Sequence, residues 1–188
     1  MTSLIMVRHA HSPFVFGQEC SRGLSEQGEK DAKKTTEILS GETIHGIVSS
    51  PYKRAIQTVE GLANERGLVI QLFEELKERR LKGSYKLSED EIDHAIKRSF
   101  DDQGYALEGG ESLKDVQHRA IPLINDLLNK YKGQTVVLGT HGNIMTIIMN
   151  YFDTKYDYEF WKTTTKPDIY KLEFHDLNLH SVERLWKK

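Results

Sequence analysis

Cysteine is almost absent from this 188-residue sequence, and proline is scarce. The single cysteine, Cys20, excludes a disulfide framework within the chain and any zinc site built from several cysteines. Only four prolines occur, and no repeat or Pro/Ser-rich stretch divides the chain. We therefore expect a single domain over residues 1–188, and the cysteine usage suits a reducing compartment, the cytoplasm.

The sequence also lacks an excess of one charge and any long apolar segment. Twenty-six Lys and Arg residues balance 28 Asp and Glu residues, for a formal net charge of −2. A nearly neutral chain is not attracted as a whole to nucleic acid or to an anionic membrane, so any phosphate binding has to be local. The apolar run that begins at Leu4 ends before Arg8, which is too short for a signal peptide or a membrane span. We expect neither a nucleic-acid nor a membrane partner.

Apolar periodicity predicts strands that alternate with helices. The predicted strands cover residues 3–7, 45–49, 68–73, 134–139, 168–174 and 182–186. The predicted helices cover residues 25–39, 51–66, 88–100, 111–131 and 143–152. This alternation predicts an α/β fold, a three-layer sandwich in which helices cover both faces of a mainly parallel sheet.

Two local features of the chain bear on how these elements begin and connect. Ser50 followed by Pro51 is typical of a helix start, with the serine as the capping residue. Ser88 and Glu91 have the spacing of a capping box, which predicts a helix start in an otherwise charged and aperiodic stretch. We expect residues of about 78–110 to form a helical and loop insertion that acts as a lid over a site.

Two predicted strands each end in a histidine, and a third leads into an arginine. His9 follows Arg8 at the end of the first strand, and His141 follows the strand 134–139. Arg54 lies in the first turn of the helix after the second strand, where free amides already favour an anion. Ligands of open α/β sheets bind at the carboxyl ends of strands. Arginine binds phosphate oxygens and imidazole can attack phosphorus, so this pattern predicts phosphoryl chemistry.

A general acid for such a reaction has several candidates after the third predicted strand. Glu74, Glu75 and Glu78 lie there, and each could protonate a leaving alkoxide if it were buried. The stretch is highly charged, so a solvated surface role is about as frequent for any one of them. Position in the sequence alone does not distinguish which of the three glutamates is the acid.

Six segments of the chain resemble, in order, motifs of a known family. They are VRHAHS, GLSEQGEKDA, SSPYKRAIQT, ELKER, EGGESLKDV and GTHGN. VRHAHS is similar to an Arg-His-Gly motif, and SSPYKRAIQT is similar to a Ser-x-x-x-Arg-Ala-x-x-Thr motif. Together they resemble the histidine phosphatase superfamily, also called the phosphoglycerate mutase-like family, over almost the whole chain.

The resemblance implies a role for each candidate. It implies His9 as the nucleophile that becomes phosphohistidine and Glu78 as the acid, with Glu75 as the alternative because the spacing from Glu78 to Gly83 is one residue longer than in the family. The residues expected to contact the substrate are Arg8, Ser12, Arg54, His141 and Gly142. No metal and no cofactor are expected, since positive side chains supply the charge.

The sequence departs from the family pattern beside the nucleophile. Ala10 stands where the family has glycine, and Val15 stands where an asparagine contacts phosphate in the mutase branch. Ser12 and Gln18 are candidates to replace that amide. The phosphate site is therefore expected to differ in detail from that of the mutases.

Three functions are compatible with these residues. The first is metal-independent hydrolysis of a small-molecule phosphate ester through phosphohistidine by a monomer or homodimer. The second is a cofactor-dependent phosphoglycerate mutase, against which the short chain argues because the mutases have longer insertions and a longer C-terminal tail. The third is a non-catalytic module that binds a phospholigand, which would not require the histidine nucleophile.

Overall fold

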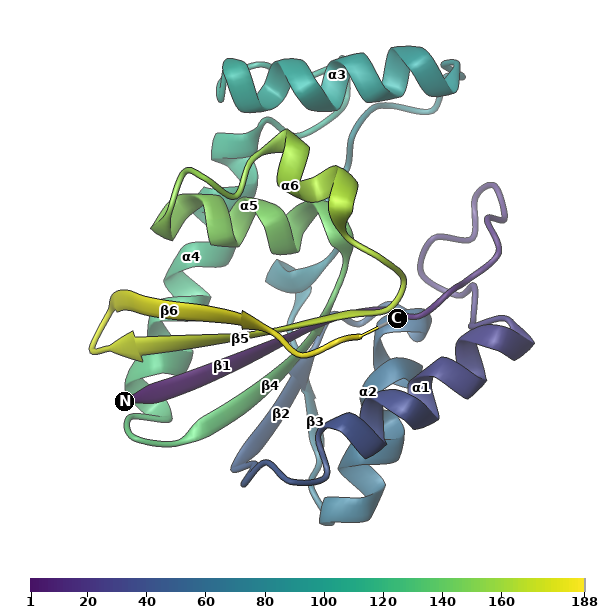
Figure 1. Ribbon diagram of the computed structural model, residues 1–188. Coiled ribbons are helices and arrows are strands. Elements are labelled where there is room, and N and C mark those ends of the chain that lie inside the picture. The colour runs from purple at the N-terminus through teal and green to yellow at the C-terminus, as the bar shows by residue number, and fades with distance from the viewer. Residues whose placement is uncertain (188) are drawn as a thin grey trace.

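The computed structural model describes residues 1–187, and its centre is one six-stranded sheet (Figure 1). The strands are β1 (Thr2–Arg8), β2 (Gly46–Ser49), β3 (Ile70–Leu72), β4 (Thr135–Thr140), β5 (Asp168–His175) and β6 (Asn178–Arg184). The helices are α1 (Glu26–Ile38), α2 (Lys53–Arg66), α3 (Glu89–Asp101), α4 (Leu113–Lys130), α5 (Gly142–Phe152) and α6 (Tyr158–Thr163), with a short 3₁₀ helix, η1 (Glu74–Leu76). None of the helices within residues 1–187 is long and apolar enough to cross a membrane.

The sheet has the strand order β3-β2-β4-β1-β5-β6 and is mixed. The four strands from β3 to β1 are parallel, whereas β5 runs antiparallel to β1 and β6 antiparallel to β5. Because β5 is antiparallel, its first residue lies at the same sheet edge as the last residues of the parallel strands. The predicted fold class, a helix-covered and mainly parallel α/β sheet, is confirmed.

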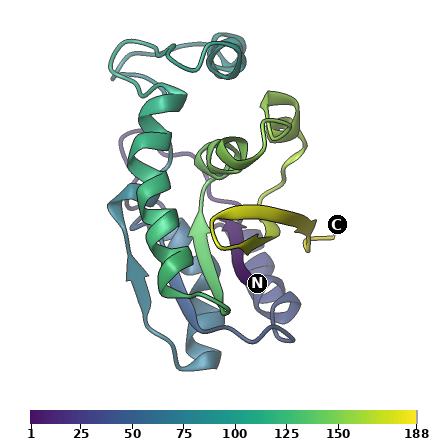
Figure 2. The same cartoon turned by 90° about the vertical axis from the view of Figure 1, so that its left-hand side faces the viewer.

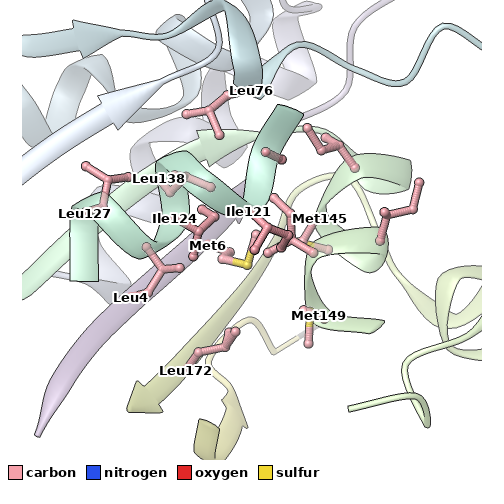
Figure 3. Packing of buried hydrophobic residues seen from close by; sticks show 14 of the residues in the cluster. Leu4, Met6, Leu76, Ile121, Ile124, Leu127, Leu138, Met145, Met149 and Leu172 are labelled. Carbon is pink, nitrogen blue, oxygen red and sulfur yellow. The ribbon is translucent and has the colours of Figure 1, made fainter. Parts of the chain in front are cut away.

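Each face of the sheet carries its own apolar core. Side chains of β1 alternate between the faces, so Leu4 and Met6 join one cluster and Ile5 and Val7 the other. The first cluster packs against α4 and α5, as Figure 3 shows, and the second packs against α1 and α2. Figure 2 shows α4 and α5 lying along the same side of the strands. Burial on both faces explains why β1 reads as a continuous apolar run.

Several expected boundaries are correct for local reasons. The hydroxyl of Ser88 accepts the Glu91 N–H and the Glu91 carboxylate accepts the Ser88 N–H, which is the predicted capping box. Gly67 ends α2 in the left-handed conformation, at φ 63°, as expected for a glycine stop. Short-range hydrogen bonding of this kind is readable from sequence.

Other expectations are wrong. The second helix begins at Lys53, not at Pro51, and Tyr52 is its N-cap. The Ser50 hydroxyl accepts the Tyr52 N–H and lies against a histidine of the site, so it does not cap the helix. The last strand covers residues 178–184, because a two-residue turn joins it to β5 in a hairpin, and α6 was not predicted. The start of α2 depends on the contact of Ser50 with His141, and the ends of the last strand depend on its pairing with β5. Both contacts involve residues outside the element itself, so its own sequence does not define its boundaries.

Candidate active site

The two histidines lie together at the carboxyl edge of the sheet. β1 and β4 are parallel neighbours with Arg8 opposite Thr140, so His9 and His141 leave the sheet side by side. Their ring centroids are 5.2 Å apart in an edge-to-face arrangement. His9 is 5% exposed and His141 is fully buried. The structure therefore brings together the two histidines that the sequence placed at separate strand ends.

Hydrogen bonds define which nitrogen of His9 carries its proton. Nδ1 lies 2.7 Å from the Ala10 carbonyl oxygen, which can only accept, so Nδ1 donates. Nε2 is then unprotonated, and its lone pair accepts a hydrogen bond from the Arg54 Nε–H at 3.2 Å. Burial holds the pKa of His9 well below its usual value, and the charges of Arg54 and Arg8 lower it further. His9 is thus a neutral imidazole with an available Nε2, the form required of a nucleophile.

Arg54 reaches His9 from the first turn of α2 and is 1% exposed. Its guanidinium also donates to Glu19, at 2.6 Å to the carbonyl oxygen and 3.1 Å to the carboxylate. The other oxygen of that carboxylate lies 3.4 Å from Arg22 Nε. The half-exposed Glu19 carboxylate therefore lies between two guanidinium groups, one of which contacts His9, and this position suits an anion.

The Ser12 side chain is hydrogen-bonded within the loop that carries Glu19 and Arg22. Its hydroxyl donates to the Gly23 carbonyl at 2.7 Å and accepts from Arg22 at 2.8 Å. The Ser12 hydroxyl thus already donates its only proton to the Gly23 carbonyl. Gln18, the other candidate to replace the asparagine amide, is exposed on the same loop, as is Val15. The predicted contact between Ser12 and substrate stays a prediction.

Arg8 crosses the start of α5 beside the histidines. A Cβ atom at Gly142 would lie only 2.5 Å from the Arg8 Cζ, so a glycine at this position lets the guanidinium pass. One terminal nitrogen of Arg8 donates to the Thr164 hydroxyl, while its buried Nε has no hydrogen-bond partner among the described residues. A buried donor of this kind is suited to an incoming oxygen.

His141 is held from the β2 side of the site. Its Nε2 lies 2.8 Å from the Ser50 hydroxyl oxygen, and the Tyr52 ring packs 5.2 Å away. Its buried Nδ1 has no partner within residues 1–187. Burial holds the pKa of His141 well below its usual value, and the positive charge of Arg54 and the neighbouring His9 ring lower it further. His141 is therefore a neutral ring whose Nε2 is hydrogen-bonded to Ser50.

The structure separates the candidate acids. The Glu78 carboxylate accepts the N–H groups of Asn143 at 3.2 Å and Ile144 at 3.0 Å, in the first turn of α5. Its negative charge acts on Arg8 and Arg54, which places it near the arginines of the site. The side chains of Glu74 and Glu75 are exposed instead. Geometry therefore favours Glu78 over the alternatives that the sequence left open.

Several contact residues of this cluster were not singled out from the sequence. They are Glu19, Arg22, Tyr52, Thr164 and Asp168. Most lie in aperiodic loops, where no pattern distinguishes them from solvated polar residues. Within residues 1–187, no group of three His, Cys, Asp or Glu side chains is arranged to hold a metal ion.

A helix-covered sheet with a neutral histidine among arginines at its carboxyl edge is typical of enzymes that transfer phosphoryl groups through histidine. Residues 4–183 match the histidine phosphatase superfamily (branch 1). The chain belongs to this superfamily and is an enzyme of its phosphatase class.

Relatives of both phosphatase and mutase type are similar to the chain. It is 28% identical over 160 residues to glucosyl-3-phosphoglycerate phosphatase of Mycolicibacterium vanbaalenii, covering 77% of this chain and 71% of that protein. It is 30% identical over 219 residues to 2,3-bisphosphoglycerate-dependent phosphoglycerate mutase of Staphylococcus saprophyticus, covering 92% and 95%. The structure of mycobacterial glucosyl-3-phosphoglycerate phosphatase with inorganic phosphate superimposes with a TM-score of 0.78 at 26% identity, covering 97% and 94%.

Proposed function

We propose that this enzyme hydrolyses small phosphate monoesters through a covalent phosphohistidine on His9, without a metal ion. The observation that carries the proposal is the tautomer of His9, whose Nδ1 proton is held by the Ala10 carbonyl while Nε2 stays unprotonated. Arg54 and Arg8 lie beside this nitrogen and can stabilise the charge on a phosphoryl group.

The first step forms the bond between His9 Nε2 and phosphorus and breaks the ester P–O bond. The leaving alkoxide takes the proton of the Glu78 carboxylic acid, so that a neutral alcohol leaves. Arg8, Arg54 and His141 stabilise the phosphoryl oxygens. The phosphoryl group of the substrate displaces the Glu19 carboxylate from Arg54, and the free-energy cost of breaking that ion pair is included in the free energy of substrate binding.

The second step returns the enzyme to its starting state. The Glu78 carboxylate takes a proton from water as the water oxygen attacks phosphorus. The bond between phosphorus and His9 Nε2 breaks, and inorganic phosphate leaves. Glu78 thus acts first as an acid and then as a base, and each cycle balances in protons.

We also propose that residues 1–188 form one domain in which the insertion of about 78–110 acts as the lid. Arg79, 6% exposed, donates to the Ser99 hydroxyl at 2.8 Å and to the Glu111 carbonyl at 3.0 Å, so it ties α3 to the segment that carries Glu78. Figure 1 shows α3 on the α5 and α6 side of the sheet. Specificity commonly lies in such insertions.

Mutase activity is the second candidate, because a mutase is similar over 92% of the chain. That alignment spans 219 residues, more than the 188 of this chain, so the mutase has segments that this chain lacks. A mutase must exclude water while its phosphohistidine exists, which favours a more extensively covered site. Hydrolysis is therefore the better supported activity.

The test is phosphate release from a panel of esters that includes p-nitrophenyl phosphate, with and without EDTA. We expect release in both conditions, together with acid-labile label on the native chain and none on His9→Ala after rapid quench. Conversion of 3-phosphoglycerate to 2-phosphoglycerate without phosphate release would favour the mutase. Activity lost with EDTA and restored by magnesium would contradict the metal-free mechanism.

A further inference from the structure

The segment that enters β5 lies against Arg8 at both of its ends. Asp168, the first residue of β5, is the register partner of Arg8, and the Thr164 hydroxyl accepts a hydrogen bond from the Arg8 guanidinium. Lys166 is the middle residue between these two points. The antiparallel pairing of β5 with β1 thus delivers a lysine to the edge of the phosphate site, although the two segments are far apart in sequence.

Local hydrogen bonds hold residues 164–168 in place and leave the Lys166 side chain exposed to solvent. The Thr165 N–H donates to the buried Asp168 carboxylate at 2.9 Å, and the Thr165 hydroxyl donates to the Pro167 carbonyl. Asp168 is in turn bound by Arg184 at 2.9 and 2.7 Å. Pro167 is buried but Lys166 is exposed. The backbone under Lys166 is therefore fixed while its ammonium can reach a ligand.

Lys166 has no ion-pair partner in the described part of the chain, unlike Lys77, Lys155 and Lys171, which pair with carboxylates. Packing around part of the exposed Lys166 side chain lowers its pKa by desolvation, and the positive charges of Arg8 and Arg22 lower it further, whereas the Glu78 carboxylate raises it. Its charge in turn contributes to lowering the pKa of His9. The site edge thus holds a cation that forms no salt bridge with a carboxylate of residues 1–187 and interacts with Glu78 only at longer range.

We propose that Lys166 binds a second anionic group of the substrate, so that the enzyme selects phosphate esters that also carry a carboxylate or another phosphate. Arg8, Arg54 and His141 are assigned to the transferred phosphoryl group, whereas Lys166 lies in the segment that leads into β5, on the β5 side of Arg8. An anion a few bonds away from the ester would relieve the repulsion among these cations. The proposal rests on the phosphatase function and assigns its specificity.

The test compares two ligands that differ only in this group. 3-Phosphoglycerate carries a carboxylate where glycerol 3-phosphate carries a hydroxymethyl group, and fructose 1,6-bisphosphate paired with fructose 6-phosphate tests a second phosphate. Affinities are measured by calorimetry on a His9→Ala protein, which does not turn the ligands over. Turnover of p-nitrophenyl phosphate by the native chain tests the phosphatase function separately, so failure of one is distinguishable from failure of the other.

We expect at least one anionic ligand to bind about tenfold more tightly than its matched partner, in line with a charge-assisted contact. Lys166→Met should reduce that ratio to about one, and Lys166→Arg should keep most of it. Lys162→Met is the matched control, since this exposed lysine of α6 packs on Tyr158, and it should leave the ratio unchanged. Equal weakening of both ligands by Lys166→Met would show that Lys166 contacts the shared phosphoryl group, and would overturn the proposal. A native ratio near one in both pairs would overturn it as well.

Discussion

Replacement of Glu78 by glutamine tests the assignment of the general acid. The leaving alkoxide of an alkyl ester is a strong base, so breaking its bond to phosphorus depends on a proton donor, whereas a phenolate leaves without one. A positioned acid contributes about 10²–10⁴-fold to rate. We therefore expect Glu78→Gln to reduce turnover of glycerol 3-phosphate by that factor and turnover of p-nitrophenyl phosphate by less than tenfold.

The structure also predicts what this change does to stability. One Glu78 oxygen accepts the N–H groups of Ile144 and Arg79, and the other accepts that of Asn143 at 3.2 Å. A glutamine oxygen can keep the first two bonds, but its NH₂ group would then face the Asn143 N–H. One unsatisfied donor costs about 1–3 kcal/mol, or roughly 2–12 °C in Tm for a chain of this size. The variant should therefore remain folded at assay temperature.

Glu75→Gln is the matched control, because the Glu75 side chain is exposed and only its backbone carbonyl is bound, by Arg119. It should change neither Tm nor the ratio of the two turnover rates. Steady-state rates on both esters and a thermal melt of each variant distinguish Glu78 from Glu75 as the general acid. Equal losses on both esters with Glu78→Gln would refute the acid role and leave Glu78 as a group that positions the start of α5. A leaving-group effect with Glu75→Gln would transfer the role to Glu75.

The remaining predictions concern the phosphate site. The lowered pKa of His9 keeps Nε2 unprotonated as pH falls through 6.5, so kcat/KM should hold between pH 7 and 6, and an NMR titration of the His9 ring with a midpoint at or above 6.5 would contradict this. Arg54→Ala should lower turnover about a hundredfold or more, as loss of one oxyanion donor does, whereas the exposed neighbour control Lys53→Ala should not. Gly142→Ala should force the Arg8 guanidinium aside and lower kcat/KM by about a hundredfold, with crystallographic displacement of Arg8 as the structural check.

Short-range patterns account for the elements that were predicted well. The apolar run of β1 is buried on both faces, and the capping box at Ser88 forms between residues three positions apart. By contrast, the start of α2 was misplaced because the Ser50 hydroxyl is bound to His141, whose position depends on a strand 85 and more residues later. Tertiary contacts of this kind override local capping preference.

The alternation of strands and helices can be predicted from the sequence pattern, and with it the meeting of His9, His141 and Arg54. Carboxyl ends of parallel strands share one edge, so residues that end them converge whatever lies between. Tertiary contacts, by contrast, bring the Glu78 carboxylate and not that of Glu75 to the start of α5, and place Lys166 beside Arg8. The loop geometry selects the glutamate, and the antiparallel register of β5 with β1 positions the lysine. Neither depends on a repeating pattern, because each arises from contacts between segments distant in sequence.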